Sequence, residues 1–395
     1  MIIPMSTKSK YPSRKVLVSA ALIAALAVTG LLGVTSIAAG QAANNTPIQN
    51  NAVRISTSQA SSSSSDNPSD YFVLQSQQEL FDAIKTGQAE EIFAKIGQSA
   101  SEIKMVSITD YNITGSDGNS NNNNNNTIRV RFYDPGVQDK PAPLLVYLYG
   151  RSGEDRNMDS SDPGLRILAN STGFMVATMD YKFAPFSASL DDVVATVRWI
   201  HQNSEQLGVD SQRIALGGES RGANLALSTA LALRDSDNSE DQTLVRVLYL
   251  LNGYYSPDLL ESNSARMFGN GTDLITSADI EMIFDQMHQN KSDYSNPLAF
   301  PLLSKNLTEL PPMYIVASGI DPIKDESIKL AMRLQEEGQE YYLSMWPGVG
   351  HSAASFIFTP VIPELQSYHD SMTVYLRGTL TDNNTKTETE PNNNE

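Results

Sequence analysis

The stretch that decides the fold is Arg213–Leu233, with the sequence RIALGGESRGANLALSTALAL. Its first four residues, RIAL, include the short apolar run Ile214–Leu216 and are typical of a buried strand, and its last eleven are rich in strong helix formers. The chain must therefore turn sharply within GGESRG. Because Gly218 and Gly222 lack the Cβ atoms that would collide with a neighbouring strand or helix, the pattern predicts a tight strand-to-helix turn that presents Ser220.

The same alternation of strand and helix continues on both sides of this turn. Apolar runs predict strands, and apolar residues at helical spacing predict helices. Strands alternating with helices predict an α/β fold with a mostly parallel central sheet covered on both faces, and ligands then bind beyond the carboxyl ends of the strands. The predicted strands are Ile128–Phe132, Leu144–Leu148, Phe174–Met179, Arg213–Leu216, Val245–Leu251, Met313–Ala317 and Tyr341–Met345, and the predicted helices are Leu190–Gln202, Ala223–Leu233 and Ile328–Glu337.

A serine on such a turn needs a base to act as a nucleophile. The chain has four histidines. His351 follows a predicted strand and the loop WPGVG, whose proline and glycines suit a histidine on an exposed loop. It also follows Ser220 in the chain, the order found in serine hydrolases with this kind of turn. The other histidines, which we expect at the surface or at helix ends, are His201, His288 and His369.

The carboxylate partner of the histidine is expected after a strand that lies between Ser220 and His351. Asp321 meets this condition, since it follows the strand MYIVA in the segment ASGIDPIKDES. A carboxylate there would fix the imidazole tautomer and stabilise the imidazolium. Asp325 and Glu326 compete for the role, but their position is also typical of residues in the first turn of a helix.

Backbone N–H groups are expected to stabilise negative charge that develops on a substrate oxygen. One donor is the N–H of Arg221, directly after the serine. The others are predicted in the loop after an early strand, at Gly150, Arg151 and Ser152, where glycine allows a close approach of the backbone.

Composition narrows the partners and the chemistry. The formal charge of −17 argues against nucleic acid, because binding phosphates requires a basic surface. The absence of cysteine excludes disulfides, thiolate metal sites and cysteine nucleophiles. No metal or organic cofactor is implied, and the oligomeric state is left open.

The N-terminal region has the layout of an export signal. A basic segment, Lys8–Lys15, precedes the uncharged run Val16–Ala39 and the small residues AAGQAA. Residues 1–40 are therefore predicted to be a signal peptide or an N-terminal membrane anchor, with the remainder extracytoplasmic and the membrane contacted only through this segment. Polar, Asn/Ser-rich composition predicts a disordered linker at 41–70 and a disordered tail at 379–395, which leaves 71–378 as the folded domain.

Several motifs in their order along the chain resemble one known family, the hormone-sensitive-lipase-like branch of the α/β-hydrolases. The resemblance runs from about Ile128 to Ala354. It rests on Asp180–Pro185 (DYKFAP) for D-Y-R-L-A-P, Gly218–Gly222 (GESRG) for G-D-S-A-G, Asn296–Leu298 (NPL) for S-P-L, Leu310–Pro312 (LPP) and Asp321–Glu326 (DPIKDE) for D-P-L-R-D-E. The resemblance implies an α/β-hydrolase fold, hydrolysis of short or medium acyl esters, and a small helical cap from about 71–100 and 257–295.

The chain departs from the family pattern at two points. The family's H-G-G-G loop is Tyr149-Gly150-Arg151-Ser152 here, and the alanine after the nucleophile is Arg221. Backbone donors survive both changes. The arginine side chains are hypothesised to narrow the cleft or to favour an anionic ester, and the alternative is that they are solvated or salt-bridged.

The resulting interpretation is an exported serine hydrolase that cleaves a small carboxylic ester through an acyl-enzyme. Ser220 is the predicted nucleophile, His351 the base and Asp321 the residue that orients it. Two alternatives stay open. One is a secreted peptidase or amidase of the same fold, and the other is a catalytically inactive hydrolase that serves as a surface binding module, which the altered Tyr149–Ser152 loop would favour.

Overall fold

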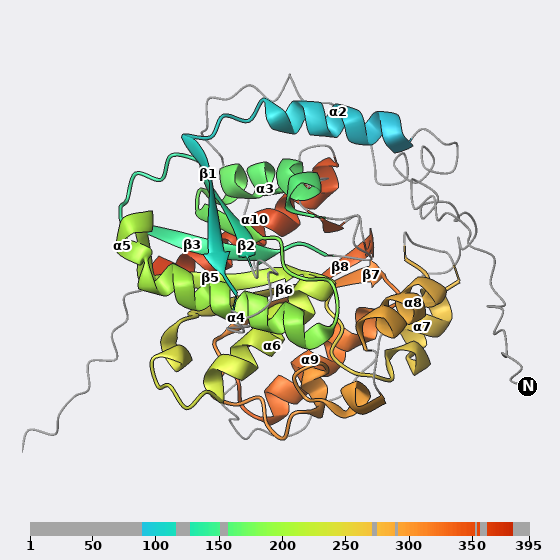
Figure 1. Cartoon of the computed structure of the whole chain (residues 1–395). Coiled ribbons are helices and arrows are strands. Elements are labelled where there is room, and N and C mark those ends of the chain that lie inside the picture. The colour runs from blue at the N-terminus through green and yellow to red at the C-terminus, as the bar shows by residue number, and fades with distance from the viewer. Residues whose placement is uncertain are drawn as a thin grey trace, which may run out of the picture. The chain divides into compact units, whose positions relative to one another are not determined.

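An eight-stranded sheet lies at the centre of the chain (Figure 1), with the strand order β1-β2-β4-β3-β5-β6-β7-β8. The computed structural model describes residues 89–115, 127–150, 157–270, 275–288, 291–351, 354–355 and 362–381. β1 and β2 pair antiparallel, as do β2 and β4, and the pairings from β4 through β8 are parallel, which confirms the predicted mostly parallel sheet. The strands are β1 (Ser107–Thr114), β2 (Thr127–Asp134), β3 (Ala142–Leu148), β4 (Met175–Met179), β5 (Val209–Glu219), β6 (Val247–Leu251), β7 (Met313–Ile320) and β8 (Tyr341–Gly350).

Helices cover both faces of this sheet (Figure 1). α4, α6 and α9 pack on one face, and α3 and α10 pack on the other. The α-helices are α2 (Ala89–Ser101), α3 (Met158–Thr172), α4 (Phe186–Gln202), α5 (Ser204–Leu207), α6 (Arg221–Arg234), α7 (Asn263–Phe268), α8 (Ser277–Met287), α9 (Lys324–Glu336) and α10 (Gln366–Thr381). Short 3₁₀ helices occur at Asp241–Thr243, Leu259–Glu261, Lys291–Ser295, Pro301–Leu303 and Pro363–Leu365.

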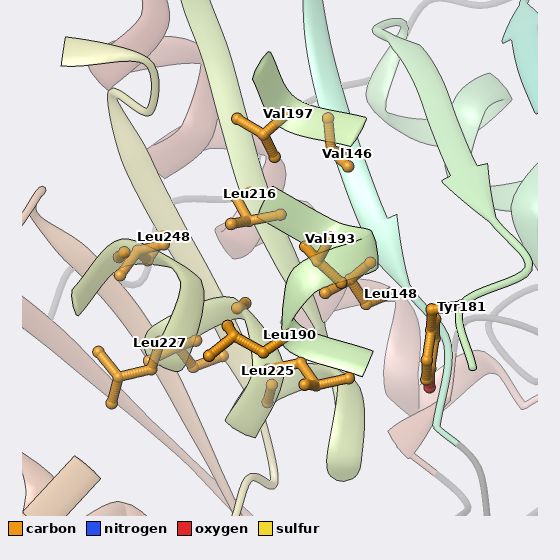
Figure 2. Close-up of a cluster of buried hydrophobic side chains, with 14 of the residues drawn as sticks. Val146, Leu148, Tyr181, Leu190, Val193, Val197, Leu216, Leu225, Leu227 and Leu248 are labelled. Atoms are coloured by element: carbon orange, nitrogen blue, oxygen red, sulfur yellow. The ribbon is translucent and has the colours of Figure 1, made fainter. Parts of the chain in front are cut away.

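The central strands are apolar throughout because both of their faces are buried. All seven residues of β3 are buried. Val146 and Leu148 belong to the core cluster that α4 and α6 cover, and Figure 2 shows them beside Val193 and Val197 of α4. Tyr147, between them, and Leu145, before them, belong to the cluster under α3 and α10. The continuous apolar run therefore predicts the strand correctly.

Among the elements that were not predicted from the sequence, β1 and α3 are the most informative. β1 reads SITDYNIT, and its mostly exposed residues lie at the edge of the sheet, so it carries no apolar run. α3 contains Pro163 followed by a glycine, which is typical of a loop. Burial of Leu165 and Leu168 and a capping box between Asn157 and Ser160 hold this helix together despite the proline.

The predicted terminal segments fall mostly outside the described residues. This holds for residues 1–40, for the linker at 41–70 and for most of the tail at 379–395. The tail prediction needs a correction at its start, because α10 continues to Thr381 and Leu380 is buried in the core under it. Among the residues that the structure describes, no helix is long and apolar enough to cross a bilayer.

Candidate active site

Ser220 occupies the junction between β5 and α6, as the GGESRG pattern predicts. Its backbone has φ 54° and ψ −117°, a conformation that residues other than glycine rarely adopt. Its N–H donates to the carbonyl of Leu251 on β6 (2.8 Å). A Cβ atom on Gly222 would lie 1.9 Å from the carbonyl oxygen of Leu148, and one on Gly218 would lie 2.3 Å from the same atom. Backbone packing against β3 therefore imposes the strained turn and requires both glycines.

His351 and Asp321 meet at the same edge of the sheet. Asp321 directly follows β7, and His351 directly follows β8. His351 Nδ1 lies 2.8 Å from Asp321 Oδ2, and the second carboxylate oxygen accepts the N–H of Ile323 (2.8 Å). Asp321 is fully buried and His351 is 9 % exposed. A buried carboxylate at this distance fixes the orientation and the tautomer of the ring.

The competing carboxylates are committed to other contacts in the first turn of α9. Glu326 is fully buried and accepts the N–H groups of Tyr255 (2.9 Å) and Ser256 (2.6 Å). Asp325 accepts the N–H of Ser264 (3.0 Å) at the start of α7. Both residues therefore join α9 to the segment after β6, and Asp321 is the carboxylate that contacts the His351 ring.

The described part of the loop after β3 makes two hydrogen bonds with neighbouring segments, one through Gly150 and one through Tyr149. The Gly150 N–H donates to Glu219 Oε1 (3.3 Å), which belongs to the residue before Ser220. The Tyr149 carbonyl accepts the hydroxyl of Tyr181 (2.5 Å). The sequence predicted Gly150 as a donor to the oxyanion and did not reveal that Glu219 accepts its N–H in the structure. The predicted donors Arg151 and Ser152 lie outside the described residues.

Arg221 is buried rather than solvated. Its side chain is 1 % exposed, and its guanidinium donates to the carbonyl of Phe183 and to Ser189 Oγ (2.6 Å). The guanidinium carbon also lies 4.7 Å from the centre of the Phe183 ring, within the range of a cation–π contact. The Arg221 side chain thus fixes the segment before α4 beside Ser220. The predicted oxyanion donor at this position is its backbone N–H.

A small, partly open pocket lies beside Ser220. Apolar side chains dominate its wall, and α8 contributes three of them. This places α8, which lies in the predicted cap range 257–295, over the serine. Of the first predicted cap range, 71–100, the described part forms α2, which packs on α3 through residues such as Ile96 and Ala100. The residues lining the cavity are Ser220, Arg221, Tyr254, Ile275, Ile280, Ile283, Phe284 and Ile323.

Two histidines are buried, although they were expected at the surface or at helix ends. His288 does follow the last turn of α8, but it is 4 % exposed, and burial lowers its pKa to about 4. His369 is 1 % exposed inside α10, and burial lowers its pKa to about 3. The signal was present: His288 lies four residues after Phe284, and His369 three before Met372, so each falls on an apolar helix face. His201 is half-buried near the end of α4.

The structure offers no obvious metal centre in its described part. Among those residues there is no group of three or more histidine and acidic side chains placed to hold a metal ion. The chemistry available at the carboxyl edge of the sheet is that of a serine hydroxyl, an imidazole with its carboxylate, and backbone N–H groups.

Known proteins share this architecture. A family model described as the alpha/beta hydrolase fold matches residues 145–355. An acetyl esterase of Salmonella schwarzengrund (strain CVM19633) is 31 % identical over 229 residues, which are 57 % of this chain and 69 % of the relative.

Solved structures agree on the fold. An esterase from the archaeon Pyrobaculum calidifontis superposes with a TM-score of 0.62 at 24 % identity, covering 73 % of this chain and 93 % of the other. A bacterial heroin esterase superposes with a TM-score of 0.63 at 26 % identity, covering 75 % and 92 %. The chain therefore belongs to the hormone-sensitive-lipase-like family of α/β-hydrolases, a family of serine hydrolases that comprises esterases and carboxylesterases.

Proposed function

We propose that this protein is an exported carboxylesterase that hydrolyses short or medium acyl esters with Ser220, His351 and Asp321. The observation that carries the proposal is one juxtaposition. The strained serine, the His351–Asp321 pair at 2.8 Å and an apolar pocket all lie at the carboxyl ends of the parallel strands of one sheet. This is the edge at which α/β sheets bind ligands.

In the proposed mechanism, Ser220 Oγ attacks the ester carbonyl carbon while the His351 Nε2 atom takes its proton. Asp321 accepts the Nδ1–H of the ring and stabilises the imidazolium that results. The carbonyl oxygen becomes an oxyanion. It is stabilised by the N–H of Arg221 and by N–H groups of the loop after β3, which contains Gly150, Arg151 and Ser152. Collapse of this intermediate breaks the bond to the alcohol, which leaves with the proton from His351.

The acyl-enzyme is then hydrolysed by water. His351 removes a proton from the water molecule as it attacks the acyl carbon, and the same backbone donors stabilise the second oxyanion. Ser220 leaves with the proton from His351, and the free acid is released. Each step uses groups of this chain and water, so the proposed reaction needs no added group.

The cavity supports an acyl group of limited length. Ile280, Ile283 and Phe284 of α8 face it, so a buried acyl chain gains about 0.8 kcal/mol for each methylene that fits. A chain that outgrows the space has to displace α8. The acetyl esterase among the relatives supports the short end of this range.

The test is hydrolysis of p-nitrophenyl acetate and p-nitrophenyl butyrate by the full chain beside a Ser220→Ala variant. We expect turnover that the Ser220→Ala substitution abolishes. Ser171→Ala, which removes a half-buried serine of α3 far along the chain from the site, should retain the wild-type rate. A Ser220→Ala variant with undiminished turnover would refute the assignment.

Two outcomes of the same assay would favour the alternatives. Faster cleavage of a matched p-nitroanilide than of the ester would indicate an amidase or peptidase. A folded wild-type chain with no turnover and no reaction with a fluorophosphonate would indicate a binding module whose altered loop has disabled catalysis.

Export is a separate part of the proposal, and its support is the basic and apolar pattern within residues 1–40. Expression of the full chain in a secreting host, followed by fractionation, tests it. Recovery in the membrane or the medium agrees with an anchor or a cleaved signal. Exclusive recovery in the cytoplasm contradicts export.

A further inference from the structure

Asn252 lies between the three strand ends that carry the proposed catalytic residues. It directly follows β6 and is 2 % exposed. Its φ of 49° is in the left-handed region, which asparagine tolerates better than most residues other than glycine. No step of the mechanism above uses it.

The side chain of Asn252 joins two of these strand ends. Its Oδ1 atom accepts the N–H of Ser318 (3.0 Å), and its Nδ2 atom donates to Ser318 Oγ (2.9 Å) and to the carbonyl oxygen of His351 (3.2 Å). Its own N–H donates to Val316 of β7 (3.2 Å). All polar groups of the amide are therefore used, and all partners belong to β7 or to His351.

The backbone next to Asn252 reaches the third strand end. Leu251, the preceding residue, accepts the N–H of Ser220 (2.8 Å). The dipeptide Leu251-Asn252 thus contacts all three strand ends. The Leu251 carbonyl accepts the N–H of Ser220, and the Asn252 amide contacts His351 and Ser318, which is three residues before Asp321.

The β7–β8 ladder is irregular where this contact occurs. Its register is regular from Met313 to Ser318 and shifts before Ile320 pairs with Gly350. Backbone groups at such a shift lose their usual partners and need others. The Asn252 amide supplies an acceptor for the N–H of Ser318 on β7 and a donor for the carbonyl of His351, the residue directly after β8.

We propose that Asn252 is a positioning residue, which holds the main chain of His351 in place so that its ring serves both Asp321 and Ser220. The proposal rests on the function proposed above. Gly348 and Gly350 precede His351, and neither has a side chain that could anchor the loop. Val349, between them, packs its side chain in the core, and the Asn252 amide adds a hydrogen bond to the main chain of His351 itself.

An amide is required by the pattern of donors and acceptors. An ionised aspartate at this position still accepts the Ser318 N–H, but it has no hydrogen to donate. Its second oxygen would face the His351 carbonyl oxygen, which repels it. A carboxylate in this place also favours the imidazolium form of His351 and raises the pKa of the ring.

The test compares Asn252→Gly, Asn252→Asp and Ser318→Ala with the wild type. Glycine keeps the left-handed backbone and removes the amide. Ser318→Ala removes the hydrogen bond from Asn252 Nδ2 to Ser318 Oγ and leaves the hydrogen bond from Asn252 to the His351 carbonyl. We expect Asn252→Gly to lower kcat about 10- to 100-fold with KM changed less than about twofold, because a displaced base impairs the chemical step. Ser318→Ala should stay within about threefold of wild type.

Two further readouts separate positioning from a merely structural role. Fluorophosphonate labelling of Ser220, which also needs the base, should slow in Asn252→Gly by the same factor as kcat. The acidic limb of the pH profile of kcat/KM should move to higher pH in Asn252→Asp and stay in place in Asn252→Gly.

The possible results are distinguishable. An inactive wild type refutes the proposed function. An active wild type with folded Asn252→Gly and Asn252→Asp variants that match it in kcat, labelling rate and pH profile overturns the positioning role alone. Equal losses in Asn252→Gly and Ser318→Ala also overturn it, because the contact with His351 would then not be the one that matters.

Discussion

Substitution of Gly222 by alanine tests the packing that creates the serine turn. The added Cβ would lie 1.9 Å from the carbonyl oxygen of Leu148 and 2.7 Å from its carbon. Ordinary contacts begin near 3.4 Å, so the start of α6 must retreat by about 1.5 Å from β3 (3.4 − 1.9). Overpacking of this kind costs about 1–3 kcal/mol, and contact with rigid backbone places the cost at the upper end.

Gly378 in α10 is a matched control. It is also a helical glycine, but a Cβ there meets nothing within 4 Å and its φ is not positive. Alanine should stabilise this helix by about 0.5–1 kcal/mol. The free energies of unfolding of Gly222→Ala and Gly378→Ala should therefore differ by at least about 1.5 kcal/mol, with opposite signs relative to wild type.

The assay is urea unfolding followed by circular dichroism, together with ester turnover under conditions where each variant is folded. Since a displacement of 1 Å at a reacting group costs on the order of 100-fold in rate, Gly222→Ala should lose about that much turnover. Gly378→Ala should keep the wild-type rate. Equal stability and turnover in the two variants would show that α6 does not pack against β3 as described.

Three further predictions concern the site and its surroundings. Asp321→Asn should lower kcat about 10⁴-fold and leave the fold intact, because the amide favours the wrong tautomer of His351; near-wild-type kcat would contradict the pairing. Glu219→Ala should lower kcat more than it changes KM, because the Gly150 N–H loses its partner, whereas Glu219→Gln keeps an acceptor and should be milder; equal effects would contradict this. The His288 pKa falls from 6.5 to about 4 on folding, so the unfolded chain binds one more proton than the folded chain between these two pH values. The free energy of unfolding of the wild type therefore drops as the pH falls from 6.5 to about 4, by about 1.4 kcal/mol per pH unit. The urea midpoint of His288→Phe should therefore fall less between pH 7 and pH 5 than that of the wild type, and equal changes would refute the assignment.

The parallel core of the sheet could be predicted from the sequence because local and tertiary signals agree there. In the Arg213–Leu233 stretch, the apolar run, the glycines and the helix formers all favour one arrangement. The strand at Leu144–Leu148 is buried on both faces, so its composition alone reveals it. β1 and α3 were missed because pairing with β2 and burial of one helix face outweigh their local composition.

The proposed catalytic residues could be picked out because each follows a strand, and the fold brings strand ends together. The supporting residues could not. Asn252 and Glu219 act through contacts with backbone groups of Ser318, His351 and Gly150, which lie 66, 99 and 69 positions away in the chain. No local pattern encodes such distances. The helical spacing of His288 from Phe284 indicates burial, but a polar histidine is normally expected at the surface.

The most direct test of the proposed mechanism is the site of covalent labelling by a fluorophosphonate, located by mass spectrometry of peptides from the labelled wild-type chain. The account predicts one adduct per chain, on Ser220, with ester turnover lost in proportion to labelling and no adduct in Ser220→Ala. An adduct on another residue, or full turnover in a chain fully labelled at Ser220, would contradict it.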